Sequence, residues 1–324
     1  ACDLHPDYAS TIGAQRMAAH GDSLVQIQHH VAHVLSCMAD NGLEPPVLGV
    51  SWDGTGLGED GMIWGGEFIL VTDETEKRVA HLRPFPLPGG DAAMREPRRS
   101  ALGMLYTLLG DDAAAFMPSD DEHWSVSSLP VLMRMLERRI NSQMTTSVGR
   151  LFDAVASIIG VRQVSRFEGQ SAMELEWLVG AERPPETYRI EVQHLSRSAR
   201  PPDSPADDME CLILDWELMV RSILRDRASG VPRETIAHGF HHALAAAIHE
   251  VAVEHHISRV VLTGGCFQNR ILTEMTLDML AQSGIRGYIH QRIPPNDGGI
   301  ALGQIVAARR ALSAVQGARE ANAG

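Results

Sequence analysis

The sequence lacks the features of small disulfide-bonded scaffolds, zinc fingers and membrane proteins. Its 324 residues include only four cysteines, and none of them forms a CxxC pair, which excludes a cysteine-based zinc finger and argues against a disulfide framework. No apolar run approaches the roughly 20 residues of a membrane span. The first residues contain neither a basic region nor an apolar stretch, so we expect no signal peptide. Free thiols in a reducing cytoplasm are the expected state of Cys2, Cys37, Cys211 and Cys266.

Positive charge is also scarce. Lys and Arg total 28 against 41 Asp and Glu, and the formal net charge is -13. Nucleic-acid surfaces are built from clustered Lys and Arg that neutralise phosphates, so we expect no nucleic-acid partner. With 44% hydrophobic and 21% charged residues, the composition is that of a folded globular protein. Its length suits one large domain or two fused lobes.

The hydrophobic pattern predicts an α/β fold, with a sheet on which helices pack. We expect helices at residues 14–38, 235–255, 268–282 and 298–315. We expect strands at residues 47–52, 63–71, 78–82, 260–263 and 287–290. A turn at 53–56 should end the first strand, and the Pro- and Gly-rich residues 84–90 should end the first group of strands. Residues 92–229 are expected to be mainly helical, with polar interruptions at 118–127 and 196–208.

The sharpest pattern of polar residues is His29-His30-Val31-Ala32-His33. Positions i and i+4 lie one turn apart on the same face of a helix, so His29 and His33 can offer two imidazoles to one ion. His30 is rotated by about 100° and should face elsewhere. Two neutral imidazoles suit Fe or Zn rather than Mg or Ca. Solvated histidines, or histidines satisfied within the core, would give the same pattern.

A glycine-rich segment, Asp53-Gly54-Thr55-Gly56, follows the first predicted strand. Small residues let backbone N–H groups approach an anion such as a phosphate, and the carboxylate at the strand end can complete a metal shell. A hairpin turn in which Asp53 is only a turn former explains the same residues.

Two later junctions between a strand and a helix carry polar residues. Gly264-Gly265 precedes a predicted helix with Asn269 in its first turn, and such a junction can pass close under a nucleotide or be only a tight turn. Asp297 precedes the last predicted helix, where it can be the N-cap or a further carboxylate ligand.

The order of these segments resembles the superfamily of sugar kinases, Hsp70 and actin, in the branch that handles carbamoyl groups. Within that branch it is most similar to the C-terminal domain of the HypF family of hydrogenase-maturation carbamoyltransferases. The resemblance runs almost from end to end. It is carried by DLHPDY (3–8), QHHVAH (28–33), DGTG (53–56), WGGEF (64–68), LPGGD (87–91), REPRR (95–99), GRLFDAV (149–155), EGQ (168–170), GGCFQNR (264–270) and PPNDGG (294–299).

The resemblance implies a two-lobed α/β fold of the actin/Hsp70/sugar-kinase type, with helical insertions and an incomplete first lobe. Residues 1–46 would be the remainder of the first lobe, including the metal-binding helix. Residues 47–324 would form the second lobe, with a helical insertion at about 92–234.

The resemblance also implies the site residues. One mononuclear divalent metal, Fe or Zn, would be held by His29, His33, Asp53 and Asp297. Residues facing the phosphates of ATP or AMP would be Gly54, Thr55 and Gly56. Residues at or beside the nucleoside would be Asp153, Gly169, Asn269, Gly264 and Gly265. No catalytic residue is assigned, and His30 is a candidate for moving protons.

The activity implied by the resemblance is carbamoyl transfer. In the family, carbamoyl phosphate and ATP give a carbamoyl-adenylate in a neighbouring domain, and the domain resembled here passes the carbamoyl group to the C-terminal cysteine thiolate of HypE, toward the cyanide ligands of nickel–iron hydrogenase. Adenylate formation is expected to need that neighbouring domain. The nucleophile comes from the partner, so Cys37 and Cys266 are expected to be structural. The alternatives are a small-molecule O-carbamoyltransferase and a non-catalytic docking fragment.

Overall fold

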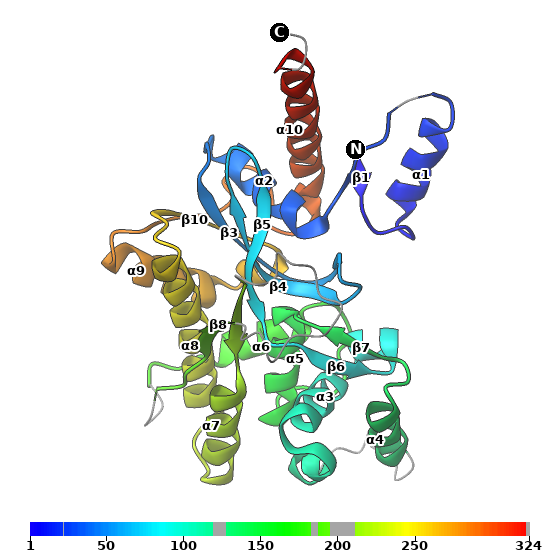
Figure 1. The fold of residues 1–324 in the computed structure, drawn as a ribbon. Coiled ribbons are helices and arrows are strands. Elements are labelled where there is room, and N and C mark those ends of the chain that lie inside the picture. Colours follow the sequence, from blue (N-terminus) through cyan, green and yellow to red (C-terminus); the bar gives the residue numbers. More distant parts are fainter. Residues whose placement is uncertain (22, 119–127, 183–186, 195–210, 322–324) are drawn as a thin grey trace.

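The computed structural model describes residues 1–324 except 22, 119–127, 183–186, 195–210 and 322–324. Within the described residues lies a nine-stranded mixed sheet whose main order is β11-β10-β3-β4-β5-β9-β8, with β6 and β7 pairing beside β4 (Figure 1). Its strands are β3 (Val47–Leu57), β4 (Ile63–Val71), β5 (Glu76–Leu82), β6 (Phe85–Pro88), β7 (Ser142–Thr145), β8 (Glu191–His194), β9 (Leu212–Asp215), β10 (Arg259–Thr263) and β11 (Arg286–Tyr288). A separate parallel pair joins β1 (Cys2–Asp3) to β2 (Gln26–Ile27).

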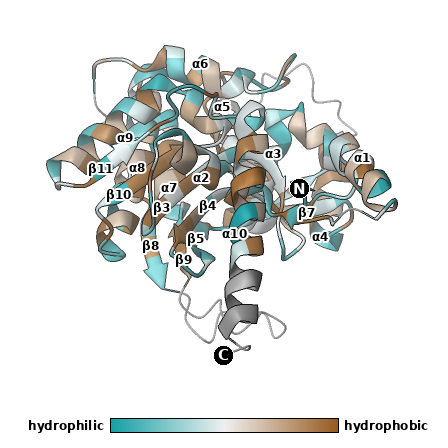
Figure 2. Ribbon diagram, turned by 90° about the horizontal axis from the view of Figure 1, so that it is seen from above, coloured by the Kyte–Doolittle hydropathy of each residue, from teal (hydrophilic) through white to brown (hydrophobic). Residues whose placement is uncertain are grey.

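Helices pack on both faces of the large sheet. The α-helices of the described residues are α1 (Ala9–Ala18), α2 (His29–Asp40), α3 (Pro97–Leu109), α4 (Ser128–Arg138), α5 (Val148–Ile158), α6 (Gln170–Leu178), α7 (Glu217–Ala228), α8 (Arg233–Glu254), α9 (Arg270–Gln282) and α10 (Ile300–Ala321). Helix α1 contacts β1 of the separate strand pair, and α10 packs mainly on α2. Helix α2 contacts β3, β4 and β10 and also packs against α10, while α5 contacts β3 and β4. Figure 2 shows hydrophobic residues along α2, where the helix lies over the sheet.

The side chains of β3 alternate between two hydrophobic cores. Leu48, Val50 and Trp52 belong to the larger core, which includes residues of α5 and α8. Val47 belongs to the smaller core, together with Val34 of α2. Gly49 lies directly under α2, because a Cβ there would lie 2.2 Å from Cγ2 of Val34. Successive strand residues point to opposite faces, so Asp53 is placed on the face that α2 covers.

The predicted helix at 14–38 is wrong. Helix α1 ends at Ala18, strand β2 follows at 26–27, and α2 begins only at His29. Gly21, which follows α1, has φ +107°, a backbone conformation that glycine adopts readily and that is incompatible with a continuing helix. The Gln28 side chain then caps α2 through its Oε1, which accepts hydrogen bonds from the backbone N–H groups of His30 and Val31.

The predicted turn at 53–56 is also wrong. These residues continue β3, which pairs antiparallel with β4 as far as Leu57, with an irregularity in register between Trp52 and Gly56. Glycine occurs inside strands where another group approaches the backbone closely. Here the approaching groups are the imidazoles of α2, because a Cβ on Gly56 would lie 2.5 Å from Cε1 of His30.

The region predicted to be mainly helical contains strands as well. Strands β7, β8 and β9 lie within it, and β6 occupies the Pro-rich segment that was expected only to end the first group of strands. Prolines are tolerated in β6 because it pairs only with β7 in the described part of the chain. The polar interruptions predicted at 118–127 and 196–208 lie almost wholly outside the described residues.

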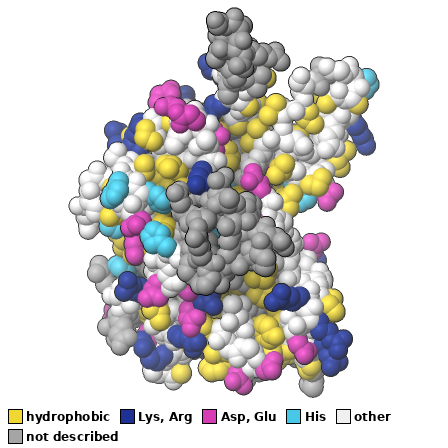
Figure 3. Space-filling model, viewed as in Figure 1, with side chains coloured by type: hydrophobic (Ala, Val, Ile, Leu, Met, Phe, Trp, Pro, Cys, Tyr) yellow, Lys and Arg dark blue, Asp and Glu magenta, His cyan; other side chains and the backbone are white. Residues whose placement is uncertain are grey.

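The other elements are close to their predicted positions, and the mixed α/β class is confirmed. Strands β4 and β5 pair antiparallel. The last helix begins at Ile300 rather than at residue 298, because a 3₁₀ turn (Asp297–Gly299) precedes it. None of the helices within the described ranges combines the length and hydrophobicity needed to cross a membrane. On the face drawn in Figure 3, Lys and Arg side chains are interspersed with Asp and Glu.

Candidate metal centre

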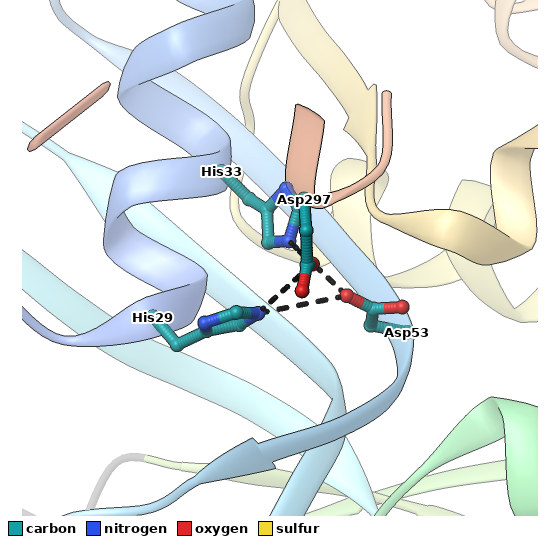
Figure 4. Close-up of side chains that lie close together, drawn as sticks. All are labelled: His29, His33, Asp53 and Asp297. Atoms are coloured by element: carbon teal, nitrogen blue, oxygen red, sulfur yellow. Dashed lines mark ion pairs between the residues drawn. The ribbon is translucent and has the colours of Figure 1, made fainter. Parts of the chain in front are cut away.

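Two histidines of α2 point from one face of the helix toward two carboxylates (Figure 4). Because Gln28 caps the helix, His29 occupies its first turn and His33 its second. Their side chains are each only 1% exposed. Asp53 reaches the cluster from β3, and Asp297 reaches it from the 3₁₀ turn before α10.

The four side chains bring their donor atoms together. Nε2 of His33 lies 3.1 Å from Oδ2 of Asp53 and 3.4 Å from Oδ1 of Asp297. Nε2 of His29 lies 3.7 Å and 3.4 Å from the same two oxygens. One ligand atom from each residue lies within 4.8 Å of all the others. Of the four residues only Asp297 is exposed, so the cluster is open on that side.

Three of these donor atoms are buried without a hydrogen-bond partner. They are Nε2 of His29, Nε2 of His33 and Oδ2 of Asp53. Buried polar atoms are normally satisfied, because leaving them unpaired costs free energy. A cation bound by all three would satisfy them at once. Two imidazole nitrogens with two carboxylate oxygens suit zinc or iron better than magnesium or calcium, so the arrangement fits the predicted type of metal.

Asp3 orients His29, a role that no pattern in the sequence indicates. Its Oδ2 lies 2.7 Å from Nδ1 of His29, and the Asp3 side chain is 3% exposed. A carboxylate on one imidazole nitrogen fixes the ring and directs the other nitrogen toward a metal. The two residues are 26 positions apart, so no helical or strand spacing could have paired them. Asp3 is the last residue of the short strand β1, which pairs with β2 immediately before α2, and this pairing is what brings its carboxylate to His29.

Backbone N–H groups orient Asp53 in a similar way. Its Oδ1 accepts hydrogen bonds from Gly54 N at 2.7 Å and Gly265 N at 3.2 Å, which leaves Oδ2 for the cluster. Gly264 makes this approach possible, because its φ is +93° and a Cβ there would lie 2.2 Å from the carbonyl oxygen of Trp52. The Gly264-Gly265 pair was predicted to lie beside a nucleoside, and the structure adds a contact with Asp53.

The clustered histidines and aspartates shift one another's pKa values in opposite directions. Burial opposes charge on His29, but contacts with Asp297, Asp3 and Asp53 outweigh it and raise the pKa well above its ordinary value. The pKa of His33 is raised in the same way, against burial, by Asp297 and Asp53. Burial favours the neutral form of Asp53, yet the two imidazoles lower its pKa well below the ordinary value. A metal ion binding at Nε2 of His29 and Nε2 of His33 would have to compete with protons for these nitrogens.

His30 does not join the cluster, as its helical position predicts. Its fully buried ring lies with Nδ1 3.2 Å from Nε2 of Gln28 and Nε2 3.8 Å from Oε2 of Glu67. Burial lowers the pKa of His30 well below its ordinary value, and the charges of His29 and His33 lower it further. Burial raises the pKa of Glu67 to about 7. The candidate role of His30 in moving protons stays a prediction.

The three residues predicted to face phosphates differ in their surroundings. Gly54 is half-buried, and a Cβ there would meet nothing closer than Oε1 of Glu168 at 3.5 Å and Nη2 of Arg150 at 3.7 Å. Thr55 is exposed. Gly56 is buried against the imidazoles of α2, which explains its small size without a phosphate. Contact of these residues with a nucleotide stays a prediction.

Asp153 and Gly169 are brought toward the Gly264-Gly265 junction by neighbouring elements. Helix α5 carries Asp153 and contacts both α6, which Gly169 precedes, and the 3₁₀ turn Gly265–Gln268. Oδ2 of Asp153 lies 2.7 Å from Nη1 of Arg150, and both side chains are buried. Burial raises the pKa of Asp153, and Arg150 opposes the shift. A nucleoside contact by either residue stays a prediction.

Asn269 has partners within the fold at both ends of its amide. It is the N-cap of α9 rather than a residue of its first turn, and its Oδ1 accepts a hydrogen bond from Leu272 N at 2.9 Å. Its Nδ2 lies 2.9 Å from Nε2 of His241, whose Nδ1 contacts the carbonyl oxygen of Ala237. Burial lowers the pKa of His241 to about 4, so this imidazole is neutral near pH 7 and accepts the amide hydrogen. The structure thus gives Asn269 a capping role, and its predicted nucleoside contact stays a prediction.

Asp297 was open to two interpretations, N-cap or ligand. Asp297 opens the 3₁₀ turn before α10, and the cap of that turn is its neighbour Asn296, whose Oδ1 accepts a hydrogen bond from Gly298 N at 3.1 Å. The carboxylate of Asp297 is turned toward His29 and His33 instead. Contacts with these two imidazoles hold the pKa of Asp297 well below its ordinary value.

Comparison with known protein families identifies the chain. The family profile described as "Carbamoyltransferase, Kae1-like Domain, second subdomain" matches residues 49–304, which is most of the chain. The profile "HypF Kae1-like domain" matches residues 1–40. The chain belongs to the HypF family of carbamoyltransferases. The family suggested by the sequence motifs is therefore confirmed.

Members of the HypF family resemble this chain over nearly all of its length. "Carbamoyltransferase HypF" of Synechocystis sp. is 36% identical over 318 residues, which cover 94% of this chain and 39% of that protein. "Carbamoyltransferase HypF homolog" of Cupriavidus necator is 36% identical over 330 residues, covering 97% of this chain and 78% of that protein. The chain therefore spans about two fifths of the first relative and more than three quarters of the second.

A solved HypF structure has the same fold. It is described as full-length HypF in the phosphate- and nucleotide-bound form, and it superposes with a TM-score of 0.80 at 35% identity. The match covers 96% of this chain and 46% of that chain.

Proposed function

We propose that this chain is a carbamoyl-transferring domain that passes a carbamoyl group from a carbamoyl-adenylate to the C-terminal cysteine thiolate of a HypE-like partner. Membership of the HypF family supports the reaction class. The observation that carries the proposal in this chain is the cluster of His29, His33, Asp53 and Asp297, with three buried donor atoms left unpaired. Carbamoyl phosphate and ATP would be the source of the adenylate, and the cytoplasm would be the place of action.

The proposed architecture is a two-lobed fold of the actin/Hsp70/sugar-kinase type. Residues 1–46 would belong to the first lobe and residues 47–324 to the second, with an insertion at about 92–234. The two family profiles support this division, because one ends at residue 40 and the other begins at residue 49.

One divalent iron or zinc ion would be held by the four clustered side chains. When bound, such an ion supplies a Lewis acid that stabilises negative charge on a phosphate or carbamoyl oxygen. Asp3 keeps Nε2 of His29 directed at the cluster, and the N–H groups of Gly54 and Gly265 do the same for Oδ2 of Asp53. The side of Asp297, whose side chain is 67% exposed, is the side from which a substrate would approach.

A nucleotide would lie beside the metal, along β3 and the N-terminal ends of α5 and α9. The open surroundings of Gly54 and the nucleotide-bound state of a related structure support this placement. Asp153, Gly169 and Asn269, with Gly264 and Gly265, remain the proposed nucleoside side of the site. Thr55 remains a proposed phosphate contact.

The nucleophile would come from the partner rather than from this chain. Cys266 is the residue of this chain to consider first, because the charge of Asp53 acts on its thiol. Burial raises the pKa of Cys266 well above its ordinary value, and the charge of Asp53 raises it further. Burial likewise raises the pKa of Cys37 to about 12. Both thiols stay protonated near pH 7, and a protonated thiol is a poor nucleophile.

The transfer can be tested in a reconstituted reaction. The chain would be incubated with zinc, ATP, carbamoyl phosphate, the HypE acceptor and a HypF relative whose own two α2-equivalent histidines are replaced by alanine. Mass spectrometry of the acceptor's C-terminal peptide would then follow the gain of one carbamoyl group. We expect the gain with the wild-type chain and its loss with His33→Ala.

Two other outcomes would contradict this proposal in different ways. A wild-type chain that binds zinc and the acceptor but transfers nothing would support a docking module. Carbamoylation of small hydroxyl compounds, with an unmodified acceptor cysteine, would support a small-molecule O-carbamoyltransferase.

A further inference from the structure

Asp297 differs from the other three clustered residues in what holds it. The side chains of His29 and His33 are 1% exposed and that of Asp53 is 13% exposed, whereas that of Asp297 is 67% exposed. Packing therefore fixes three of the donor groups but not the fourth. The position of the Asp297 carboxylate must depend mainly on how the loop of residues 291–299 is attached to the rest of the molecule.

The beginning of this loop is attached to the C-terminal end of α2 by Asp40. The Asp40 side chain is 1% exposed. Its Oδ2 accepts hydrogen bonds from Gln291 N at 2.6 Å and Arg292 N at 3.0 Å, and its Oδ1 accepts one from Nε of Arg292 at 3.0 Å. These bonds to backbone and guanidinium groups lower the pKa of Asp40 to about 2, against the effect of burial, so the carboxylate is ionised near pH 7.

The end of the loop is attached to the same helix by Ser36. Its Oγ donates a hydrogen bond to the carbonyl oxygen of Gly299 at 2.7 Å. Between the two attachments, Gly264 N donates to the carbonyl oxygen of Pro295 at 2.9 Å. Asp297 thus lies in a short loop that is bonded to α2 on both sides of it.

The attachment points and the histidines form one stripe along α2. His29, His33, Ser36 and Asp40 are spaced by four, three and four residues, and side chains with this spacing share one helix face. One end of the stripe carries the imidazoles, and the other end carries the side chains that bind the Asp297 loop. The same rigid helix can therefore set the distance between the histidines and the carboxylate opposite them.

We propose that Asp40 and Ser36 are positioning residues that hold Asp297 at its place in the metal cluster. This inference rests on the metal site put forward under the proposed function. Neither residue touches the cluster, and both act through the loop that carries Asp297. Any effect on metal affinity should therefore require the Asp297 carboxylate.

A double-mutant cycle on zinc affinity tests this role. Zinc dissociation constants would be measured by competition with a chelating dye for wild type, Asp40→Asn, Ser36→Ala, Asp297→Ala and the two double variants. We expect Asp40→Asn to weaken binding by at most about tenfold, the lower end of the range found when a direct partner of a metal ligand is removed, because Asp40 acts on Asp297 only through the loop. In the Asp297→Ala background the same change should alter affinity by less than about twofold, because residues that act through one group are not additive.

Glu76→Gln is the matched control. Oε1 of Glu76 lies 2.6 Å from Nε of Arg310, so this pair ties α10 to β5 just as Asp40 ties the loop to α2. It does not contact the Asp297 loop through any hydrogen bond found among the described residues. We expect Glu76→Gln to leave the zinc dissociation constant unchanged.

The outcomes separate this inference from the proposed function. If wild type binds zinc and Asp40→Asn and Ser36→Ala bind it equally well, the positioning role is wrong and the metal site stands. If Asp40→Asn weakens binding as strongly in the Asp297→Ala background as in wild type, the effect is a general loss of structure and the positioning role is again wrong. If wild type binds neither zinc nor ferrous iron, both proposals fail. If Asp40→Asn folds poorly, the cycle of Ser36→Ala with Asp297→Ala tests the positioning role in the same way.

Discussion

At the scale of single residues, the site depends on neighbouring groups that turn the donor atoms of His29 and Asp53 toward the cluster. Nδ1 of His29 is occupied by Asp3, and Oδ1 of Asp53 is occupied by backbone N–H groups. Each of these residues is left with one donor atom facing the cluster. The residue that tests this arrangement best is Asp3, because it lies outside the cluster and contacts only one of the two clustered histidines.

Asp3→Ala should weaken zinc binding by about 10- to 100-fold, the usual cost of losing a carboxylate behind a histidine ligand. The reason is that the His29 ring would no longer be fixed with Nε2 toward the cluster. Calorimetric titration with zinc measures the change. Asp7→Ala is the control, since Asp7 is exposed and lies in the same segment. Equal zinc affinities of Asp3→Ala and wild type would show that Asp3 does not orient the ligand.

The sequence predicted the donor residues better than their partners. The i, i+4 spacing is a local property of a helix, and it was enough to pair His29 with His33. Family resemblance added Asp53 and Asp297, which the structure brings to the same place. Asp3 could not be found in this way, because its pairing with His29 depends on how β1 and β2 meet.

At the scale of elements, β3 and α2 determine the geometry of the cluster. Glycines in β3 let the helix and its imidazoles lie close to the strand: Gly49 beneath Val34, and Gly56 beneath His30. The sequence suggested a turn at Gly54 and Gly56, since glycine is common in turns and its presence in a strand has no local signal. Only the closeness of α2, a tertiary contact, explains Gly56.

Gly56→Ala should destabilise the protein by about 1–3 kcal/mol, as overpacking in a tight interior does. The added Cβ would lie 2.5 Å from Cε1 of His30 and 3.1 Å from Cδ2 of His29, so the start of α2 must shift. Urea denaturation measures the free energy of unfolding. Gly54→Ala is the matched control in the same strand, because its Cβ would meet no atom closer than 3.5 Å. If the two variants were equally stable, close packing of α2 on Gly56 would not be the reason for glycine there.

The boundaries of the helices near the site could not be predicted from the sequence either. Residues 14–38 contain no proline, and their pattern predicts one helix. In the structure, α1 ends at Ala18 and β2 forms before α2 begins. The separate start of α2 matters for the site, because Gln28 is then the N-cap and His29 lies in the first turn. Pairing of β2 with β1 is a contact between distant segments and leaves no periodic signal in either one.

At the scale of the whole molecule, the candidate site lies where segments from both ends of the chain meet the middle of the sheet. Asp3 and α2 come from the N-terminal part, Asp53 from a central strand, and Asp297 from the turn before α10. The alternation of strands and helices predicted the α/β class. The sheet order, with β3 between β10 and β4, could not be predicted, because it depends on contacts between distant segments. That order is what brings the carboxyl end of β10 beside Asp53.

The most direct measurement of the central claim is a calorimetric titration of the metal-free chain with zinc at about pH 8 and about pH 6. His29 and His33 have raised pKa values, so both carry protons at the lower pH and the ion must displace them, while Asp53 and Asp297 stay ionised at both. The account predicts one zinc ion per chain, weaker binding at the lower pH, and loss of binding in His33→Ala. Undiminished binding of zinc by His33→Ala at both pH values would contradict it.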